Sequence, residues 1–439
     1  MLPTPSAYAE DTTFFSRPQI PRVDLQQLSP FDFYRNYVAA SQPCILRNCF
    51  NHWPANQTWN DAQDSIVQKC GKDLPVTCNF TPNGHGDHIH ANTVFVKPEE
   101  RTLPFGQVWA QLKRQTKSKE GVPYLSFQND SLRTQFPCLA KDIDVAGLTF
   151  ANQAFQGNDR ASNELAAVNL WIGNPLSVSS VHKDPFDNIY CVVRGTKTFT
   201  LLPPTDVRFL HERAFPSASY SQPQHRHQRE SKNNAHNANH DNTPPFDIVL
   251  DPTGDDEDGV VVVPWCEVDP AMPDLVRFPD FKHASPLHIE VHAGETLFLP
   301  ALWYHRVGSK HGLTIAVNYW YEMSFGPVYT AYQLARRLSG LKPEHEYTKD
   351  DLTPEQVHWC KVNKANRARR VAGSVPDHEG KVDERASKQV EQGEHVEQFN
   401  QSNQSKQSNQ SNQSNQPNQS NQSNQSNQSN QSNHSKEPM

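Results

Sequence analysis

The stretch that decides the fold is His182-Lys-Asp-Pro-Phe-Asp-Asn-Ile-Tyr-Cys-Val-Val-Arg-Gly-Thr-Lys-Thr-Phe-Thr-Leu-Leu-Pro-Pro204. Its β-rich run, the turn signal Arg-Gly-Thr and an alternating run ended by two prolines predict a β-hairpin from Asn188 to Pro203. Side chains at i and i+2 of an extended segment share one face, so His182 and Asp184 can converge on one ion while Lys183 faces away. The stretch therefore predicts a pair of metal ligands at the entrance to a β-hairpin.

A second hairpin is predicted between His288 and Pro300. The run His-Ile-Glu-Val-His turns at Ala-Gly-Glu and returns as Thr-Leu-Phe-Leu-Pro, and strand-like sequence continues to about Tyr321. Strands that alternate in this way predict a two-layered antiparallel barrel with one face toward an interior cavity. We therefore expect a mainly β (α+β) fold, a double-stranded β-helix of the jelly-roll type with flanking helices.

A third candidate ligand, His305, follows the second hairpin in Ala-Leu-Trp-Tyr-His. Two imidazoles and one carboxylate are the ligand set of mononuclear iron(II) oxygenases, in which further positions are open to a cosubstrate and O2. A His-x-Asp triplet alone is weak, because about one is expected by chance in a chain with 20 histidines. An ordinary packed histidine is the alternative for His305. The two hairpins together favour a site in which His182, Asp184 and His305 hold one metal ion.

The other histidine-rich segments are interpreted without a metal site. His85-Gly-Asp87 repeats the His-x-Asp pattern after the turn signal Thr-Pro-Asn-Gly, but no barrel strand is expected after it. A polar surface loop that includes His88 and His90 is therefore favoured. Residues 217–258 contain four histidines among Gln, Asn and Arg and too few apolar residues to fold. We predict that they form a disordered insert, in which adventitious metal binding could occur.

The residues around both hairpins resemble the JmjC-domain family of 2-oxoglutarate oxygenases. The resemblance rests on Val168–Pro204 and His292–Met323 and runs from about Pro21 to Leu341. It implies a cupin-like JmjC barrel, Fe(II) as the metal, and 2-oxoglutarate and O2 as cosubstrates. Flanking segments such as His52-Trp-Pro-Ala resemble a subgroup of lysyl hydroxylases that act on developmentally regulated GTP-binding proteins.

The resemblance also implies a role for each residue of the site. His182, Asp184 and His305 are expected to hold Fe(II), and Lys197 to pair with the distal carboxylate of 2-oxoglutarate. A cation on the hairpin surface is the alternative for Lys197. The other expected cosubstrate contacts are a tyrosine hydroxyl, a serine where the family usually has threonine, two amides and an aromatic wall: Tyr124, Ser179, Asn188, Asn318 and Trp320. The alternatives for the amides and the tryptophan are ordinary strand and core positions.

Three functions are compatible with such a site. The first is C3 hydroxylation of a lysyl residue in a GTP-binding protein, with Asp187 and Tyr190 as candidates for holding the substrate lysine. The second keeps the enzyme class but demethylates lysine, modifies RNA or cleaves histone tails as a peptidase. The third is a non-catalytic cupin-like binding module, which is expected only where the triad or the lysine is missing. The net charge of −7 argues against a nucleic-acid partner, and a homodimer is left open.

The chain divides into five predicted regions. They are a flexible N-terminus (1–20), a mixed region that packs on the barrel (21–145), the barrel (146–326), C-terminal helices (327–372) and a disordered tail (373–439). From 400 to 435 the tail is essentially an Asn-Gln-Ser repeat without apolar residues to bury. Helices are predicted over Leu28–Ala40, Gln107–Gln115, Val328–Leu338 and Pro354–Val371. The last contains four basic residues, which form either a solvated face or a nuclear-import or nucleic-acid patch.

The eight cysteines show no C-x-x-C spacing, and residues 1–22 have no apolar core of the signal-peptide type. All eight are therefore predicted to be reduced thiols in a cytoplasmic or nuclear protein that is not secreted. No run is long enough to span a bilayer, so no membrane partner is expected. Cys191 is expected in the core, and Cys44 and Cys49 are the candidates for pairing between molecules.

Overall fold

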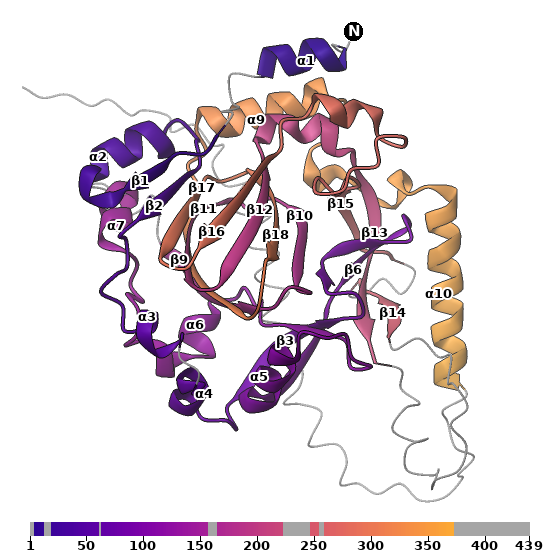
Figure 1. Ribbon diagram of the computed structural model, residues 1–439. Helices are drawn as coiled ribbons and strands as arrows, with labels where there is room; N and C mark the ends of the chain where they lie inside the picture. Colours follow the sequence, from indigo (N-terminus) through magenta and orange to yellow (C-terminus); the bar gives the residue numbers. More distant parts are fainter. Residues whose placement is uncertain are drawn as a thin grey trace, which may run out of the picture. The chain divides into compact units, whose positions relative to one another are not determined.

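The computed structural model describes residues 4–12, 19–60, 63–156, 165–222, 246–253 and 259–372, all within one compact unit, Met1–Val375. Two sheets form the centre of this unit, in the orders β1-β2-β17-β11-β19-β9 and β16-β12-β18-β10-β4 (Figure 1). The predicted mainly β (α+β) fold, a double-stranded β-helix, is therefore confirmed. The strands are β1 (Arg22–Asp24), β2 (Cys44–Arg47), β4 (His85–Gly86), β9 (Leu165–Gly173), β10 (Val178–His182), β11 (Phe186–Arg194), β12 (Thr196–Leu202), β16 (Leu287–His292), β17 (Glu295–Leu299), β18 (Tyr304–Ser309) and β19 (Thr314–Glu322).

The prediction of two hairpins is wrong. Each turn carries the chain from one sheet to the other, so the two strands that it joins do not pair with each other. β11 pairs with β17 and β19, whereas β12 pairs with β16 and β18. Both turns contain a glycine with positive φ, Gly195 at 77° and Gly294 at 89°. The turns lie side by side, since the backbone N–H of Gly294 donates to the carbonyl of Val192. Alternation identifies the strands, but which distant strand completes each ladder depends on long-range contacts.

Alternation along the strands separates a barrel interior from an outer layer. The interior cluster comes from both sheets and from β8 (Val122–Tyr124), and includes Tyr124, Trp171, Tyr190, Val192, Phe199, Leu201, Leu297, Trp303, Val307 and Ala316. The outer face of β11 carries Ile189 and Cys191, which are fully buried beneath the helices that precede the barrel. Cys191 is thus a core residue, as predicted. The two faces of one strand therefore serve two different environments, the cavity and the helical layer.

The region before the barrel contains the predicted helices. Ser29 caps the first with its hydroxyl, which accepts from the Asp32 N–H, and Pro30 occupies the first turn. The second buries Phe105, Val108 and Leu112. The helical elements here are η2 (Leu25–Gln27), α2 (Pro30–Phe33), the π-helical η3 (Tyr34–Val38), α3 (Ala55–Thr58), α4 (Ser65–Cys70), α5 (Phe105–Arg114), α6 (Ser131–Thr134), η4 (Pro137–Leu139) and α7 (Thr149–Gln156). A small sheet joins β3 (Pro75–Thr81), β7 (Glu99–Pro104) and β8 (Val122–Tyr124).

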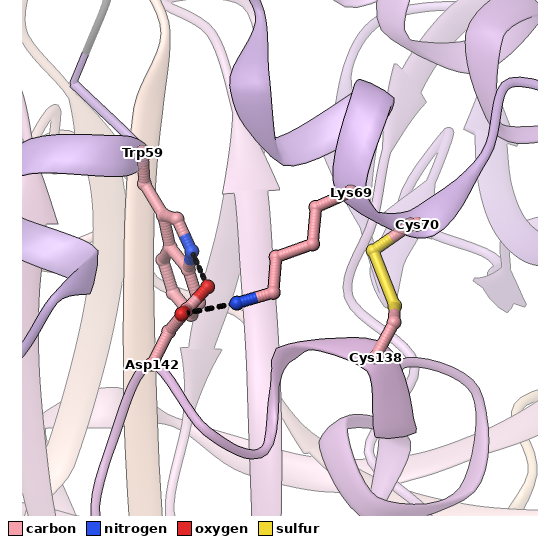
Figure 2. The surroundings of a disulfide bond; sticks show 5 residues. All are labelled: Trp59, Lys69, Cys70, Cys138 and Asp142. Carbon is pink, nitrogen blue, oxygen red and sulfur yellow. Dashed lines mark hydrogen bonds and ion pairs between the residues drawn. A yellow bond between two sulfur atoms is a disulfide. The ribbon is translucent and has the colours of Figure 1, made fainter.

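The prediction that all cysteines are reduced is wrong for Cys70 and Cys138. They form a disulfide between α4 and η4, with their Cα atoms 5.4 Å apart (Figure 2). Beside the bridge, the Asp142 carboxylate accepts from Trp59 Nε1 and pairs with Lys69 (Figure 2). The two cysteines are separated by 68 positions, so no local spacing signals the pair. The other six cysteines, the predicted candidates for intermolecular pairing included, are buried.

Three segments that were predicted to lack structure are ordered in part. The flexible N-terminus contains α1 (Pro5–Thr12), where the buried Tyr8 hydroxyl donates to the Thr205 carbonyl. The expected loop around His85 is wrong, because β4 pairs in parallel with β10 and β5 (His88–His90) pairs with β6 (Val94–Lys97). The predicted bounds of the disordered insert, 217–258, are wrong, because they include residues of two strands. β13 (Glu212–Ser221) pairs with β6, β14 (Asp247–Leu250) and β15 (Val262–Cys266). Long-range pairing thus orders segments that lack a strong local pattern. Residues 223–245 and 254–258, with the four histidines of the insert, lie outside the described residues.

The predicted C-terminal helices are present as α9 (Pro327–Leu338) and α10 (Pro354–Ala372). α10 runs along β13 and β14 (Figure 1). Short helical turns complete the structure: η5 (Pro204–Leu210), η6 (Pro279–His283), η7 (Glu344–Glu346) and η8 (Lys349–Asp351). Within the described part of the chain, none of the helices combines the length and the apolar character needed to cross a membrane. The predicted tail, 373–439, lies outside the described residues.

Candidate metal centre and cosubstrate pocket

Three side chains of the metal-ligand type meet where β10 and β18 lie side by side. His182 ends β10 and is in register with His305 on β18, and the centres of their rings are 4.2 Å apart. Asp184 lies in the bend after β10, with Oδ2 at 3.9 Å from Nε2 of His182 and 3.5 Å from Nε2 of His305. One ligand atom from each residue lies within 4.8 Å of the others. Among the residues that the structure describes, this is the only such group.

The backbone orients both imidazoles. Nδ1 of His182 lies 2.7 Å from the carbonyl of Ser180, and Nδ1 of His305 lies 2.9 Å from the carbonyl of Trp303. Because a carbonyl can only accept, each Nδ1 carries the proton, and each Nε2 keeps its lone pair for a metal ion. The bend with Asp184 is held as well, since its carbonyl accepts from the N–H of Leu302 at 2.9 Å.

The electrostatics of the site suit a cation. Burial, together with the neighbouring His305, lowers the pKa of His182 to about 4, although Asp184 acts in the opposite direction. Burial raises the pKa of Asp184, but His182 and His305 outweigh it and hold this pKa below its ordinary value. At neutral pH the site therefore offers a neutral imidazole and a carboxylate, the forms that bind metal. The donor set of two nitrogens and one oxygen fits Fe(II) with open coordination positions.

A β-bulge in β10 brings Ser179 to the same face as His182. Ser179 is in register with Val307 and His182 with His305, so three residues of β10 span two of β18. Val307 belongs to the interior cluster. Ser179 therefore faces the barrel interior together with the metal ligands. Regular alternation would place residues three positions apart on opposite faces, so the sequence alone does not predict this arrangement.

Lys197 on β12 is inside the barrel and fully buried, so the alternative of a surface cation is wrong. Its Nζ donates to the hydroxyl of Tyr124 at 3.3 Å and lies 5.1 Å from the centre of that ring. Within the described residues no carboxylate pairs with this ammonium. A buried ammonium without an anionic partner is costly, so the pocket around it suits an anionic ligand.

The predicted amides and the aromatic wall connect to this lysine through a chain of contacts. The Tyr124 ring lies 5.9 Å from Trp171, and Trp171 Nε1 donates to Oδ1 of Asn318 at 2.9 Å. Asn318 in turn donates to Asn188 at 3.2 Å. Trp320, on the same strand as Asn318, stacks on Phe186, and its buried Nε1 has no hydrogen-bond partner among the residues that the structure describes. An unsatisfied buried donor beside the amides is a further position at which a polar ligand could bind.

The two candidates for holding a substrate lysine lie on opposite faces of β11. Tyr190 belongs to the interior, with its ring centre 5.3 Å from that of Phe199, and within the described part of the chain its buried hydroxyl has no hydrogen-bond partner. Burial raises the pKa of this hydroxyl, and the nearby Tyr124 adds to the effect. Asp187 faces the outer layer, where it accepts from the Ala301 N–H at 3.1 Å. Asp187 therefore lies on the far side of the strand from the metal ligands, and Tyr190 adds a polar group to the cosubstrate pocket.

Lys183, which lies between His182 and Asp184 just after β10, faces away from the metal site as predicted. Its Nζ lies 2.8 Å from Oε1 of Glu344 and near the rings of Tyr304 and Tyr332. Glu344 also accepts from the Tyr332 hydroxyl and pairs with Arg336 at 3.3 Å. Lys183 follows His182 in the sequence, and Tyr304 precedes His305 on β18. The segment around η7 therefore supports both strands that carry the histidines. No sequence pattern signals this support, because Glu344 lies in a polar linker far along the chain.

One family model and several known proteins are similar to this chain. A family model described as a cupin-like domain matches residues 30–327. JmjC domain-containing protein E of Dictyostelium discoideum is 33% identical over 332 residues, which cover 71% of this chain and 87% of that protein. Lysine-specific demethylase JMJ32 of Arabidopsis thaliana is 34% identical over 349 residues, 76% of this chain and 91% of that protein.

A human relative is similar to the same extent. The bifunctional peptidase and (3S)-lysyl hydroxylase JMJD7 of Homo sapiens is 33% identical over 311 residues, which cover 71% of this chain and 87% of that protein. The span of the cupin-like model contains the candidate site from Tyr124 to Trp320. The site and its surrounding barrel thus fall within the matched part of the chain.

Proposed function

This chain belongs to the JmjC family of cupin-like 2-oxoglutarate oxygenases, and we propose that it hydroxylates C3 of a lysyl residue in a GTP-binding protein. It is a 2-oxoglutarate-dependent dioxygenase, with Fe(II) as the metal and 2-oxoglutarate and O2 as cosubstrates. Bound together, these groups supply the oxidising chemistry that converts an unactivated C–H bond into an alcohol. The protein contributes ligands, positioning and a cavity shielded from water.

We assign the metal to the triad, and the close approach of its three ligand atoms is the observation that carries the proposal. His182 and His305 bind through Nε2, and Asp184 binds through its carboxylate. Each imidazole is held by a backbone carbonyl, so the ligands are oriented before the metal arrives. A metal ion held by these three ligands would keep further coordination positions open to a cosubstrate.

We assign the distal carboxylate of 2-oxoglutarate to Lys197 and Tyr124. The Lys197 ammonium is fully buried and offers two further N–H donors besides its contact with the Tyr124 hydroxyl. A carboxylate is the partner that such an ammonium needs in a cavity of low polarity. We assign the remaining contacts of the cosubstrate to a serine, two amides and a tryptophan: Ser179, Asn188, Asn318 and Trp320.

Two arguments support a lysyl hydroxylase. The human relative is named a (3S)-lysyl hydroxylase, and the segments that flank the barrel resemble hydroxylases of developmentally regulated GTP-binding proteins. Demethylation is the second candidate, because a relative of equal similarity is named a lysine-specific demethylase. The human name also includes a peptidase activity. The site is the same in the first two cases, and the outcome depends on which carbon the substrate pocket holds beside the metal.

The test is a turnover assay with the full-length chain, Fe(II), ascorbate and 2-oxoglutarate. Lysine peptides from a developmentally regulated GTP-binding protein and trimethyl-lysine histone peptides are incubated in parallel and analysed by mass spectrometry. Gain of one oxygen on an unmethylated lysine is expected, and Asp184→Asn should abolish it. Loss of a methyl group from the histone peptides alone would replace the proposal with demethylation. Peptide cleavage alone would favour the peptidase.

We also propose that the protein acts in the cytoplasm or the nucleus. The six cysteines that are free thiols support a reducing compartment, whereas the Cys70–Cys138 disulfide argues against one. Imaging of the tagged chain in cells tests the proposal, and accumulation in the secretory pathway would contradict it. Whether the enzyme forms a homodimer is measured by light scattering on the purified chain.

A further inference from the structure

A pocket of about 990 Å³ lies outside the barrel. Its wall is formed by α2 and η3, by the end of α7, and by the two links Pro300–Leu302 and Met323–Val328. Asp187 on β11 also lines the pocket, whereas none of the three metal ligands does. The volume is at the upper end of the range of pockets that bind small molecules or peptide side chains. This pocket is therefore distinct from the cavity that holds the metal and the cosubstrate.

Asp187 places a carboxylate in this pocket with little to neutralise it. Asp187 is only 8% exposed. Within the described structure its carboxylate accepts one hydrogen bond, from the Ala301 N–H. Within the same described residues no lysine, arginine or histidine pairs with it. Burial raises the pKa of Asp187 to about 7, although the hydrogen bond from the Ala301 N–H acts in the opposite direction. Carboxylates this deeply buried are normally paired with a cation, so the pocket lacks a positive charge.

The rim of the pocket suits the apolar part of a basic side chain. Phe31 on α2 is 68% exposed and Tyr34 on η3 is 44% exposed, although both are large aromatic residues. Aromatic faces attract ammonium and guanidinium groups, and they cover the methylene stems of lysine and arginine. A carboxylate at depth with aromatic rings at the mouth is thus complementary to a lysine or arginine side chain. The net charge of the chain, −7, favours approach of a basic partner.

The pocket also adjoins the segment that carries the metal ligands. Ala301 and Leu302 form part of its wall, and the Leu302 N–H donates to the carbonyl of Asp184. Leu302 has a positive φ of 68°, a backbone conformation that a branched residue rarely adopts. His305 follows three residues later on β18. A substrate segment seated in the pocket would therefore lie against the turn that leads to the metal site.

We propose that this pocket binds a lysine or arginine side chain of the protein substrate, other than the lysine that reacts, through the Asp187 carboxylate. The inference rests on the proposed function in one respect, since it takes the substrate to be a protein. It adds a specificity determinant to that function: the substrate carries a second basic residue beside its target lysine. Phe31 and Tyr34 hold the stem of that residue, and Asp187 neutralises its charge.

Binding is tested first, without turnover. The full-length chain is titrated into a fluorescein-labelled peptide of alternating lysine and glycine, and into a matched peptide with glutamate in place of lysine. The basic peptide should bind and the acidic peptide should not. Asp187→Asn keeps an acceptor for the Ala301 N–H but removes the charge, and it should weaken binding about 10- to 100-fold. Asp350→Asn, at an exposed carboxylate in η8, is the control and should leave binding unchanged.

Turnover then separates the inference from the proposed function. With a hydroxylated peptide substrate, Asp187→Asn should raise KM about 10-fold or more while kcat and the KM for 2-oxoglutarate stay unchanged. An unchanged peptide KM would overturn the inference and leave the hydroxylase assignment intact. Equal binding of the basic and acidic probes would also overturn it. Charge-dependent binding without hydroxylation of any lysine would support the cation site and refute the proposed reaction.

Discussion

Lys197→Met should stabilise the ligand-free enzyme while abolishing its response to 2-oxoglutarate. The wild-type ammonium is fully buried, and its contacts are the Tyr124 hydroxyl at 3.3 Å and the face of the same ring. Methionine has a similar volume and carries no charge to desolvate. Replacing buried charge by an apolar side chain of similar volume stabilises proteins by about 1–4 kcal/mol. For a folded region of this size, that corresponds to a rise in Tm of about 1–6 °C.

The same substitution removes the partner that we assign to the distal carboxylate. Breaking a buried ion pair costs about 3–5 kcal/mol, so the affinity for 2-oxoglutarate should fall at least about 100-fold. A ligand present at 100 times its Kd stabilises a protein by about 2.7 kcal/mol, and this stabilisation should be lost. The assay is thermal unfolding with Mn(II) as an inert metal, with and without 2-oxoglutarate.

Lys310→Met is the matched control for this experiment. Lys310 pairs with Glu290 at 2.6 Å, and both side chains are more than one-third exposed. Exposed ion pairs contribute little to stability, so neither the Tm nor the response to 2-oxoglutarate should change measurably. The reasoning is refuted if Lys197→Met binds 2-oxoglutarate with wild-type affinity. It is also refuted if Lys197→Met is less stable than the wild type in the absence of ligand.

Three further predictions follow from the buried charges. His182→Ala should stay folded but lose both succinate formation and the rise in Tm on addition of Fe(II); retained turnover would contradict the triad. Glu212→Gln should lower the free energy of unfolding by about 3–5 kcal/mol in urea, because it removes the carboxylate that accepts from both Nη atoms of Arg336, 1% exposed, and leaves Glu344, at 3.3 Å, as its only carboxylate partner among the described residues; a loss below about 1 kcal/mol would contradict this. The pKa of Asp206 is raised from 3.8 to about 7 by burial, so the folded state holds a proton that the unfolded chain releases above about pH 4. Its contribution to stability is complete at low pH and is lost as the pH rises toward 7. Asp206→Asn keeps the acceptor for the Ser285 N–H, so it should remove this part of the pH dependence, and an unaltered profile in urea titrations would argue against it.

Much of the fold was predictable because the strands alternate. The run from Asn188 to Pro203 pairs β-branched and aromatic residues with a Gly turn, and both strands exist within a residue or two of the expected bounds. The capped start at Ser29 likewise predicts a helix from local chemistry. The triad was predictable for a different reason. Two imidazoles and one carboxylate beside barrel strands are the ligand set of mononuclear iron(II) oxygenases.

Other features were not predictable because they depend on residues far apart in the chain. The pairing of Cys70 with Cys138 and of Lys183 with Glu344 joins segments with no shared local pattern. The assignment of β11 and β12 to different sheets has the same origin. Local sequence identifies the strands that alternate clearly, whereas the other strands of the barrel determine their neighbours.

The sequence by itself predicted the alternating strands and the three residues of the candidate metal triad, and it left a position on the hairpin surface open for Lys197. The tertiary structure decided where the other side chains of the site point. The bulge between β10 and β18 turns Ser179 toward the metal, and strand alternation against the helical layer turns Asp187 away from it. The physical reason is that a side chain's face follows from the register of its strand against neighbours, and register is set by long-range packing.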